Sequence, residues 1–108
     1  MQEGVCMNEE FYFNVYAVVE EIPVGSVATY QLIARLCGHE KNSRLVGRAL
    51  RYAGLYGSFP CHRVVHSDGK LVEGWMEQRA LLEEEGVRFL KNGKVDMRRH
   101  LWKTGVTI

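Results

Sequence analysis

The chain has few of the features that mark secreted, zinc-binding or membrane-spanning proteins. Its three cysteines are an odd number with no C-x-x-C spacing, so neither a disulfide framework nor a zinc cluster is predicted. Residues 1–6 lack the basic and apolar stretches of a signal peptide, and the apolar runs elsewhere are too short for a membrane span. We therefore expect no membrane partner and a reducing compartment, the cytoplasm or, in a eukaryote, the nucleus.

Neither repeats nor a proline-rich linker divides the 108 residues, which include only two prolines. With 46% hydrophobic residues, the length fits a single domain over residues 1–108 with one modest core, and residues 1–8 are expected to be a disordered N-terminus. The net charge of +1 hides an uneven distribution. Residues 35–63 hold six basic side chains and one acid, which is six minus one, or +5.

Apolar periodicity and turn residues predict a small, mainly helical α/β domain. Helices are expected over residues 9–21, 30–37, 43–53 and 75–85, with a short helical piece over 97–102. Thr29 and Ser43 are the predicted N-caps of the second and third helices, and Gly38 and Gly86 are predicted stops.

Two tight turns predict short β-hairpins in the second half of the chain. Ser67-Asp68-Gly69 separates the apolar segments 63–66 and 70–72, and Asn92-Gly93 lies between residues 87–89 and Val95. The chain should therefore reverse its direction twice after residue 62.

The helix predicted over residues 43–53 has a basic face. At 100° per residue, Arg44, Arg48 and Arg51 fall within a narrow arc opposite the apolar side chains. A glycine inside a helix costs roughly 1 kcal/mol relative to alanine, so Gly47 near this arc indicates that a partner approaches the backbone closely. Two short helices with such a face outline a DNA-binding helix-turn-helix. The alternative is an ordinary surface helix with solvated arginines.

The segment around Cys61 has the composition of a reactive thiol site. A thiolate is the nucleophilic form of cysteine, and the neighbouring His62 and Arg63 can lower the pKa of the thiol. The alternative is a packed structural cysteine, because cysteine is among the most buried residue types.

Two motifs together resemble the C-terminal domain of O6-alkylguanine-DNA alkyltransferases and the alkyltransferase-like proteins. They are SRLVGRAL at residues 43–50 and PCHRV at residues 60–64. The segments IPVGSVATY at 22–30 and LLEEEGV at 81–87 extend the resemblance, which covers about residues 9–102. It implies a winged helix-turn-helix-like DNA-binding fold, and recognition and repair of O6-alkylguanine by base flipping and irreversible alkyl transfer.

The resemblance also implies roles for individual residues. Cys61 would attack the alkyl carbon and keep it as a thioether, His62 would relay the thiol proton, and Glu85 would be the carboxylate behind His62. Tyr30 would help to turn the target nucleotide and donate a proton to the guanine ring, and Arg44 would fill the gap left by the extruded base. The remaining implied DNA-binding residues are Ser43, Gly47, Arg48 and Arg51.

The implied partner is double-stranded DNA containing alkylated guanine, bound by a monomer without cofactor or metal, with a protein of a repair pathway as a further candidate partner. Two departures from the family pattern matter. Ala53 stands where the family has an asparagine, and residues 69–75 are shorter than the family's loop over the base pocket.

Three functional hypotheses remain open at this point. The retained Cys61 favours a single-turnover methylated-DNA–protein-cysteine methyltransferase. The two departures favour a non-catalytic lesion binder that flags damage for another pathway. A winged-helix transcription regulator with an incidental cysteine is the third hypothesis.

Overall fold

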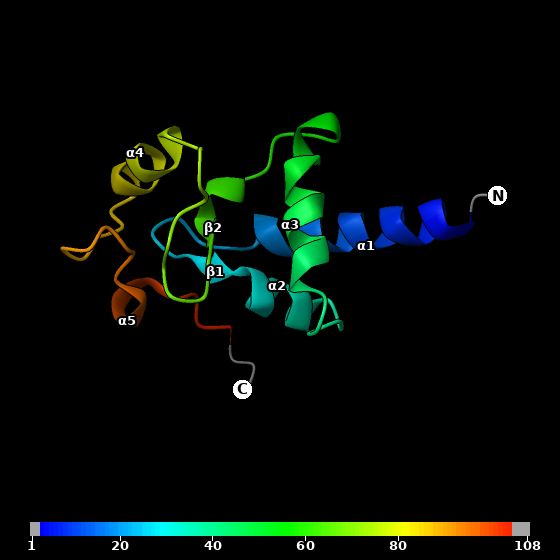
Figure 1. The fold of residues 1–108 in the computed structure, drawn as a ribbon, viewed down its shortest axis with the longest axis horizontal. Coiled ribbons are helices and arrows are strands. Elements are labelled where there is room, and N and C mark those ends of the chain that lie inside the picture. The colour runs from blue at the N-terminus through cyan, green and yellow to red at the C-terminus, as the bar shows by residue number, and fades with distance from the viewer. Residues whose placement is uncertain (1–2, 105–108) are drawn as a thin grey trace. The chain divides into compact units, whose positions relative to one another are not determined.

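The computed structural model describes the backbone of residues 3–104 and the side chains of residues 9–104. Two compact units form within the described residues, one from segments 3–21 and 30–61 and the other from segments 22–29 and 62–104. The elements in chain order are α1 (Glu3–Glu20), β1 (Ala28–Thr29), α2 (Tyr30–Leu36), α3 (Ser43–Arg51), η1 (Ala53–Leu55), η2 (Cys61–Arg63), β2 (Val64–Val65), α4 (Glu77–Glu84) and α5 (Met97–His100), with η for a 3-10 helix (Figure 1). The predicted class, a small helical domain with little sheet, is confirmed.

The first unit is a packed group of three helices. The predicted apolar stripe of α1 is buried at Phe11, Val15 and Val19, while Val18 is half-buried. The buried side chains of the other two helices are Leu32, Ile33, Ala34, Val46 and Ala49. Helices α2 and α3 are joined by residues 37–42, so the predicted helix-turn-helix outline is present.

The ends of the helices in this unit differ slightly from the prediction. Gly38 has a φ of 82° and follows α2 as a left-handed stop, as expected. The prediction of Ser43 as N-cap is wrong, because the carbonyl of Asn42 accepts the backbone N–H groups of Leu45 and Val46 at 3.0 and 3.2 Å and so occupies the cap position. At the other end α3 stops at Arg51, and the expected last turn tightens into η1.

The second unit contains a two-stranded parallel sheet. Ala28 pairs with Val64 and Thr29 with Val65. The predicted turn at Gly69 is present, since its N–H bonds to the carbonyl of His66 at 2.9 Å. The predicted hairpin is formed only at its turn, where the His66 N–H bonds to the Lys70 carbonyl at 3.0 Å. Residues 70–72 do not form a strand, and Val64 and Val65 pair instead with the parallel segment Ala28–Thr29.

The core of this unit lies beside the sheet and includes the second predicted turn. Its buried members are Val27, Val65, Leu82, Val87 and Val95. The turn at Asn92-Gly93 is confirmed by the hydrogen bond from the Leu90 N–H to the Lys94 carbonyl at 2.8 Å. No helix among residues 3–104 has the length and hydropathy needed to cross a bilayer.

The C-terminal segment is fastened to the unit around Val27. The Val27 N–H bonds to the His100 carbonyl at 2.8 Å, and the Trp102 N–H bonds to the Val27 carbonyl at 2.7 Å. The His100 ring lies 2.9 Å from the Gly25 carbonyl through Nδ1 and accepts the Arg88 N–H through Nε2 at 3.0 Å. This pairing explains why α5 ends at His100 and not at the predicted Trp102.

Two glycines with positive φ give a direct test of this unit. A Cβ at Gly69 would lie 2.7 Å from the carbonyl oxygen of Val95, whereas a Cβ at Gly93 would meet no atom within 4 Å. Because both carry positive φ, Gly93→Ala should lower the free energy of unfolding by about 1 kcal/mol, and Gly69→Ala by roughly 3 kcal/mol, since the Val95 backbone must also move. Urea denaturation measures both values. Equal losses would contradict this packing at Gly69.

Candidate nucleic-acid interface and thiol site

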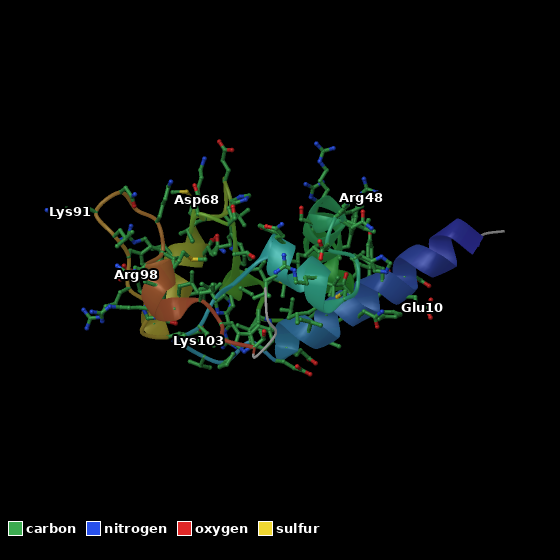
Figure 2. All side chains as sticks on the ribbon, turned by 90° about the horizontal axis from the view of Figure 1, so that it is seen from below. Glu10, Arg48, Asp68, Lys91, Arg98 and Lys103 are labelled. Carbon is green, nitrogen blue, oxygen red and sulfur yellow. The ribbon has the colours of Figure 1, made fainter. Side chains whose placement is uncertain are left out.

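Helix α3 presents its basic face to solvent. Arg44, Arg48 and Arg51 are exposed, and Figure 2 shows Arg48 pointing away from the ribbon. Among the side chains that the structure describes, no acid forms an ion pair with any of the three. Ser43 is half-buried at the start of the same helix. The arginine face is therefore free to meet a phosphate chain.

Packing within the first unit does not require a glycine at position 47. A Cβ at this position would meet only the Cε1 atom of Tyr30, at the ordinary contact distance of 3.9 Å. The helix would gain roughly 1 kcal/mol from alanine here. The contact nevertheless places Tyr30 beside Gly47, so two of the predicted DNA-binding residues are neighbours.

Cys61 is half-buried in the first unit, close enough to Tyr30 for their charges to interact. Burial raises the pKa of the Cys61 thiol above its ordinary value, and a hydrogen bond from the residue's own backbone opposes this only in part. Burial also raises the pKa of Tyr30, and the neighbouring Cys61 raises it further. The expectation of a lowered thiol pKa is wrong, because the loss of hydration outweighs the local field. Cys61 is a protonated thiol at neutral pH.

His62 and Arg63 both bind Glu85 in the second unit. The Glu85 carboxylate accepts two hydrogen bonds from Arg63, at 2.9 Å from Nε and 2.8 Å from Nη2, and lies 2.8 Å from His62 Nε2. A further Arg63 nitrogen donates to the Ile22 carbonyl at 2.8 Å. The Arg63 hydrogen bonds lower the pKa of Glu85; burial opposes this, and the His62 contact adds to the lowering. The predicted His62–Glu85 pair is thus formed.

Gln78 is a supporting residue that the sequence did not reveal. Its side chain is fully buried on α4, donates to the carbonyls of His62 and Val64 at 3.0 and 3.1 Å, and accepts the Val72 N–H at 2.7 Å. A buried amide must satisfy its polar atoms, and here it fixes the backbone on both sides of Arg63. Its one sequence signal was its position on the buried side of a predicted helix.

Tyr16 is the second residue that sequence reasoning missed. Its hydroxyl donates to the Ala49 carbonyl of α3 at 2.6 Å, and burial is the main cause that raises its pKa to about 12. Its ring stacks on Phe59 with centroids 4.8 Å apart, and a Cβ at Gly57 would lie 3.2 Å from the same Phe59 ring. Through its hydrogen bond and its stack, Tyr16 connects α1, α3 and the loop before Cys61. Ala53, which stands where the family has an asparagine, can offer only a methyl group for this purpose.

The described residues include no group of three or more His, Cys, Asp or Glu side chains that could hold a metal ion. The reactive groups among the predicted site residues are a thiol, an imidazole, a phenol and a carboxylate. They lie in two sets, Tyr30 and Cys61 in the first unit and His62 and Glu85 in the second.

Comparisons with known proteins agree on one family. A family model described as "6-O-methylguanine DNA methyltransferase, DNA binding domain" matches residues 10–87. Alkyltransferase-like protein 1 of Schizosaccharomyces pombe is 36% identical over 88% of this chain and 96% of its own length. A DNA base-flipping protein of Vibrio parahaemolyticus is 33% identical over 88% of this chain and 98% of its own length.

A methyltransferase and a solved complex complete the comparison. A methylated-DNA–protein-cysteine methyltransferase of Scheffersomyces stipitis is 43% identical, over 50% of this chain and 28% of its own length. The crystal structure of the S. pombe protein Atl1 with damaged DNA containing O6-carboxymethylguanine matches with a TM-score of 0.78 and 36% identity, over 88% of this chain and 96% of that one.

The Glu85 carboxylate predicts a specific acid sensitivity. The pKa of Glu85 is lowered in the folded state, so its carboxylate stabilises the fold fully at a pH above its pKa in the unfolded chain, which is about 4.3. This contribution to the free energy of unfolding is lost as the pH falls through the pKa in the folded state. Glu85→Gln should therefore lower the free energy of unfolding by roughly 2–4 kcal/mol at pH 7, and should flatten its pH dependence below about pH 5. Denaturant unfolding at several pH values measures both effects.

Glu84→Gln is the matched control, because Glu84 is the exposed neighbouring acid on α4. It should leave both the stability and its pH dependence close to those of the parent protein. Parallel pH curves for the parent and Glu85→Gln would contradict the ionised Arg63–Glu85 pair.

Proposed function

Because the chain belongs to the family of the 6-O-methylguanine DNA methyltransferase DNA-binding domain, we propose that it binds double-stranded DNA containing an alkylated guanine and extrudes the damaged base. The observation that carries the proposal is the exposed face of α3, where Arg44, Arg48 and Arg51 have no ion pair with any described side chain. Gly47 supports it, since nothing within the first unit requires a glycine there.

The roles on this face follow from the chemistry of the duplex. Arg48 and Arg51 neutralise phosphates, which supplies affinity without sequence preference. Arg44, at the start of α3, enters the space that the extruded guanine leaves and meets the orphaned base with its guanidinium. Tyr30, beside Gly47, assists the rotation of the nucleotide.

We further propose that the alkyl group is transferred to Cys61. The sulfur forms a bond to the alkyl carbon as the bond from that carbon to guanine O6 breaks, and the electron pair of the broken bond stays with guanine. Tyr30 supplies the proton that restores the guanine ring, and His62, held by Glu85, takes the proton of the thiol. A base is needed because burial keeps Cys61 protonated at neutral pH. A thioether has no easy leaving group, so the reaction occurs once.

A non-catalytic lesion binder is the second candidate, and two observations favour it. The S. pombe alkyltransferase-like protein and the V. parahaemolyticus DNA base-flipping protein match over almost their full length, whereas the S. stipitis methyltransferase matches half of this chain. The raised pKa of Cys61 also leaves little thiolate in the free protein. No observation favours a transcription regulator.

Replacement of single arginines tests the recognition proposal. Arg44→Ala should reduce the preference for a duplex with one O6-methylguanine over the undamaged duplex by about tenfold or more, because the extruded state loses its support. Arg51→Ala should weaken binding to both duplexes alike and reduce the slope of log affinity against log salt by about 0.9. Fluorescence anisotropy titrations measure both. Identical effects of the two replacements would remove the special role from Arg44.

Intact-protein mass spectrometry tests the transfer proposal. After incubation with the O6-methylguanine duplex, the protein should gain the mass of one CH2 group on the peptide that contains Cys61. Cys61→Ser should bind the damaged duplex but gain no mass, while the control Cys37→Ser should still react, since Cys37 is half-buried at the end of α2 and has no assigned role. Tight binding by the parent protein with no change of mass would identify the non-catalytic binder instead.

A further inference from the structure

The segment of residues 88–103 has a high density of positive charge. It carries six basic side chains and one acid, Asp96, which is six minus one, or +5. The basic side chains are Arg88, Lys91, Lys94, Arg98, Arg99 and Lys103. All but Lys94 belong to exposed residues. This charge lies outside α3 and was not singled out from the sequence.

Four of these cations form no ion pair with a described side chain. Lys94 binds Asp68 at 2.9 Å, and Arg99 lies 3.5 Å from Asp96. Among the side chains that the structure describes, no acid pairs with the other four, which are Arg88, Lys91, Arg98 and Lys103. They can therefore bind an external anion without giving up an internal contact.

The four cations stand on a fixed backbone. The hydrogen bonds of Val27 with His100 and Trp102, together with the His100 ring, fasten the segment to the rest of the second unit. In Figure 2 the labelled Lys91, Arg98 and Lys103 follow one another across this unit. A row of fixed cations suits a chain of phosphates better than a single small anion, because successive charges can meet successive phosphates.

The second unit is also electrically polarised. Residues 73–85 carry five glutamates and one arginine, which is one minus five, or −4. Figure 1 shows α4, which lies in this acidic segment, well separated from α5 within the unit. Because of this charge distribution, a polyanion should bind at residues 88–103 and not at α4.

We propose that residues 88–103 form a second phosphate-binding surface for the backbone of duplex DNA, in addition to α3. The inference rests on the proposed binding of damaged DNA and extends it. The segment lies beyond the region that the family model matches, which ends at residue 87. A membrane surface fits less well, because α5 spans only Met97–His100 and cannot offer the long amphipathic helix that binds a bilayer.

The test is a combined variant with Arg88→Gln, Lys91→Gln, Arg98→Gln and Lys103→Gln. Each lost phosphate contact should reduce the slope of log affinity against log salt by about 0.9, which gives a reduction of about 2 to 4 if two to four contacts are lost. The loss should be the same for damaged and undamaged duplexes, because phosphates carry no lesion information. Thermal unfolding verifies that the variant remains folded, as expected for exposed side chains.

Two further variants separate the possible outcomes. Glu73→Gln with Glu77→Gln and Glu84→Gln changes the net charge by three on the acidic segment and should leave the slope nearly unchanged. Arg48→Gln with Arg51→Gln should reduce the slope through α3. If the α3 variant loses slope while the four-residue variant does not, the second surface is refuted and the proposed function stands. If the parent protein shows no salt-dependent DNA binding, the proposed function itself fails.

Binding to two other polyanions tests whether DNA is the partner of this segment. The four-residue variant should lose more affinity for DNA than for vesicles with anionic lipid or for a polyglutamate peptide. If it loses binding to either of these while its DNA slope is unchanged, the segment serves a membrane or an acidic protein, and the proposal is overturned.

Discussion

The pairing of Arg63 with Glu85 is the constraint on which the second unit depends. One guanidinium binds the carboxylate through two nitrogens and the Ile22 carbonyl through a third, so three distant points of the chain meet at one side chain. Only arginine offers this planar set of donors, and lysine could not replace it. The strand β2 begins at the next residue, so this pair also fixes where Val64 enters the sheet. The backbone that follows the thiol is therefore held from both sides, with Gln78 as the second support.

The thiol that precedes this pairing owes its raised pKa to burial. Its two basic neighbours in sequence, His62 and Arg63, both bind Glu85. A protonated, half-buried thiol reacts slowly with unrelated electrophiles. The proposed transfer would use the thiol only once, so this slow reactivity would preserve the acceptor until a lesion is bound.

Sequence reasoning succeeded where the determinants are local. The apolar stripe of α1 and the turns at Gly38 and Gly93 follow from helical period and from backbone conformations that glycine adopts readily. It failed where residues far apart in the chain decide. The parallel pairing of Ala28 with Val64 could not be seen in either segment alone, because a turn after β2 suggests a hairpin with equal force.

The residues of the candidate site also differ in whether the sequence alone reveals them. The motif residues were found from their pattern, and the structure brings His62 to Glu85 and Tyr30 to Gly47. The stack of Tyr16 on Phe59 and the buried amide of Gln78 escaped notice, since each acts through tertiary contacts that its neighbours in sequence do not announce. The pKa of Cys61 was misjudged for the same reason, because burial is a property of the fold.

The proposed function requires that this chain distinguishes alkylated guanine in duplex DNA from ordinary guanine. The most direct measurement is a competition in which the parent protein, bound to a labelled duplex with one O6-methylguanine, is displaced by unlabelled duplexes that differ from each other by that single methyl group. We expect the methylated competitor to displace the label at a concentration at least tenfold lower than the unmethylated one, because only the damaged base is held outside the stack. Equal displacement by the two competitors would contradict the proposed function and leave the arginine face of α3 as a surface that binds DNA without preference for the lesion.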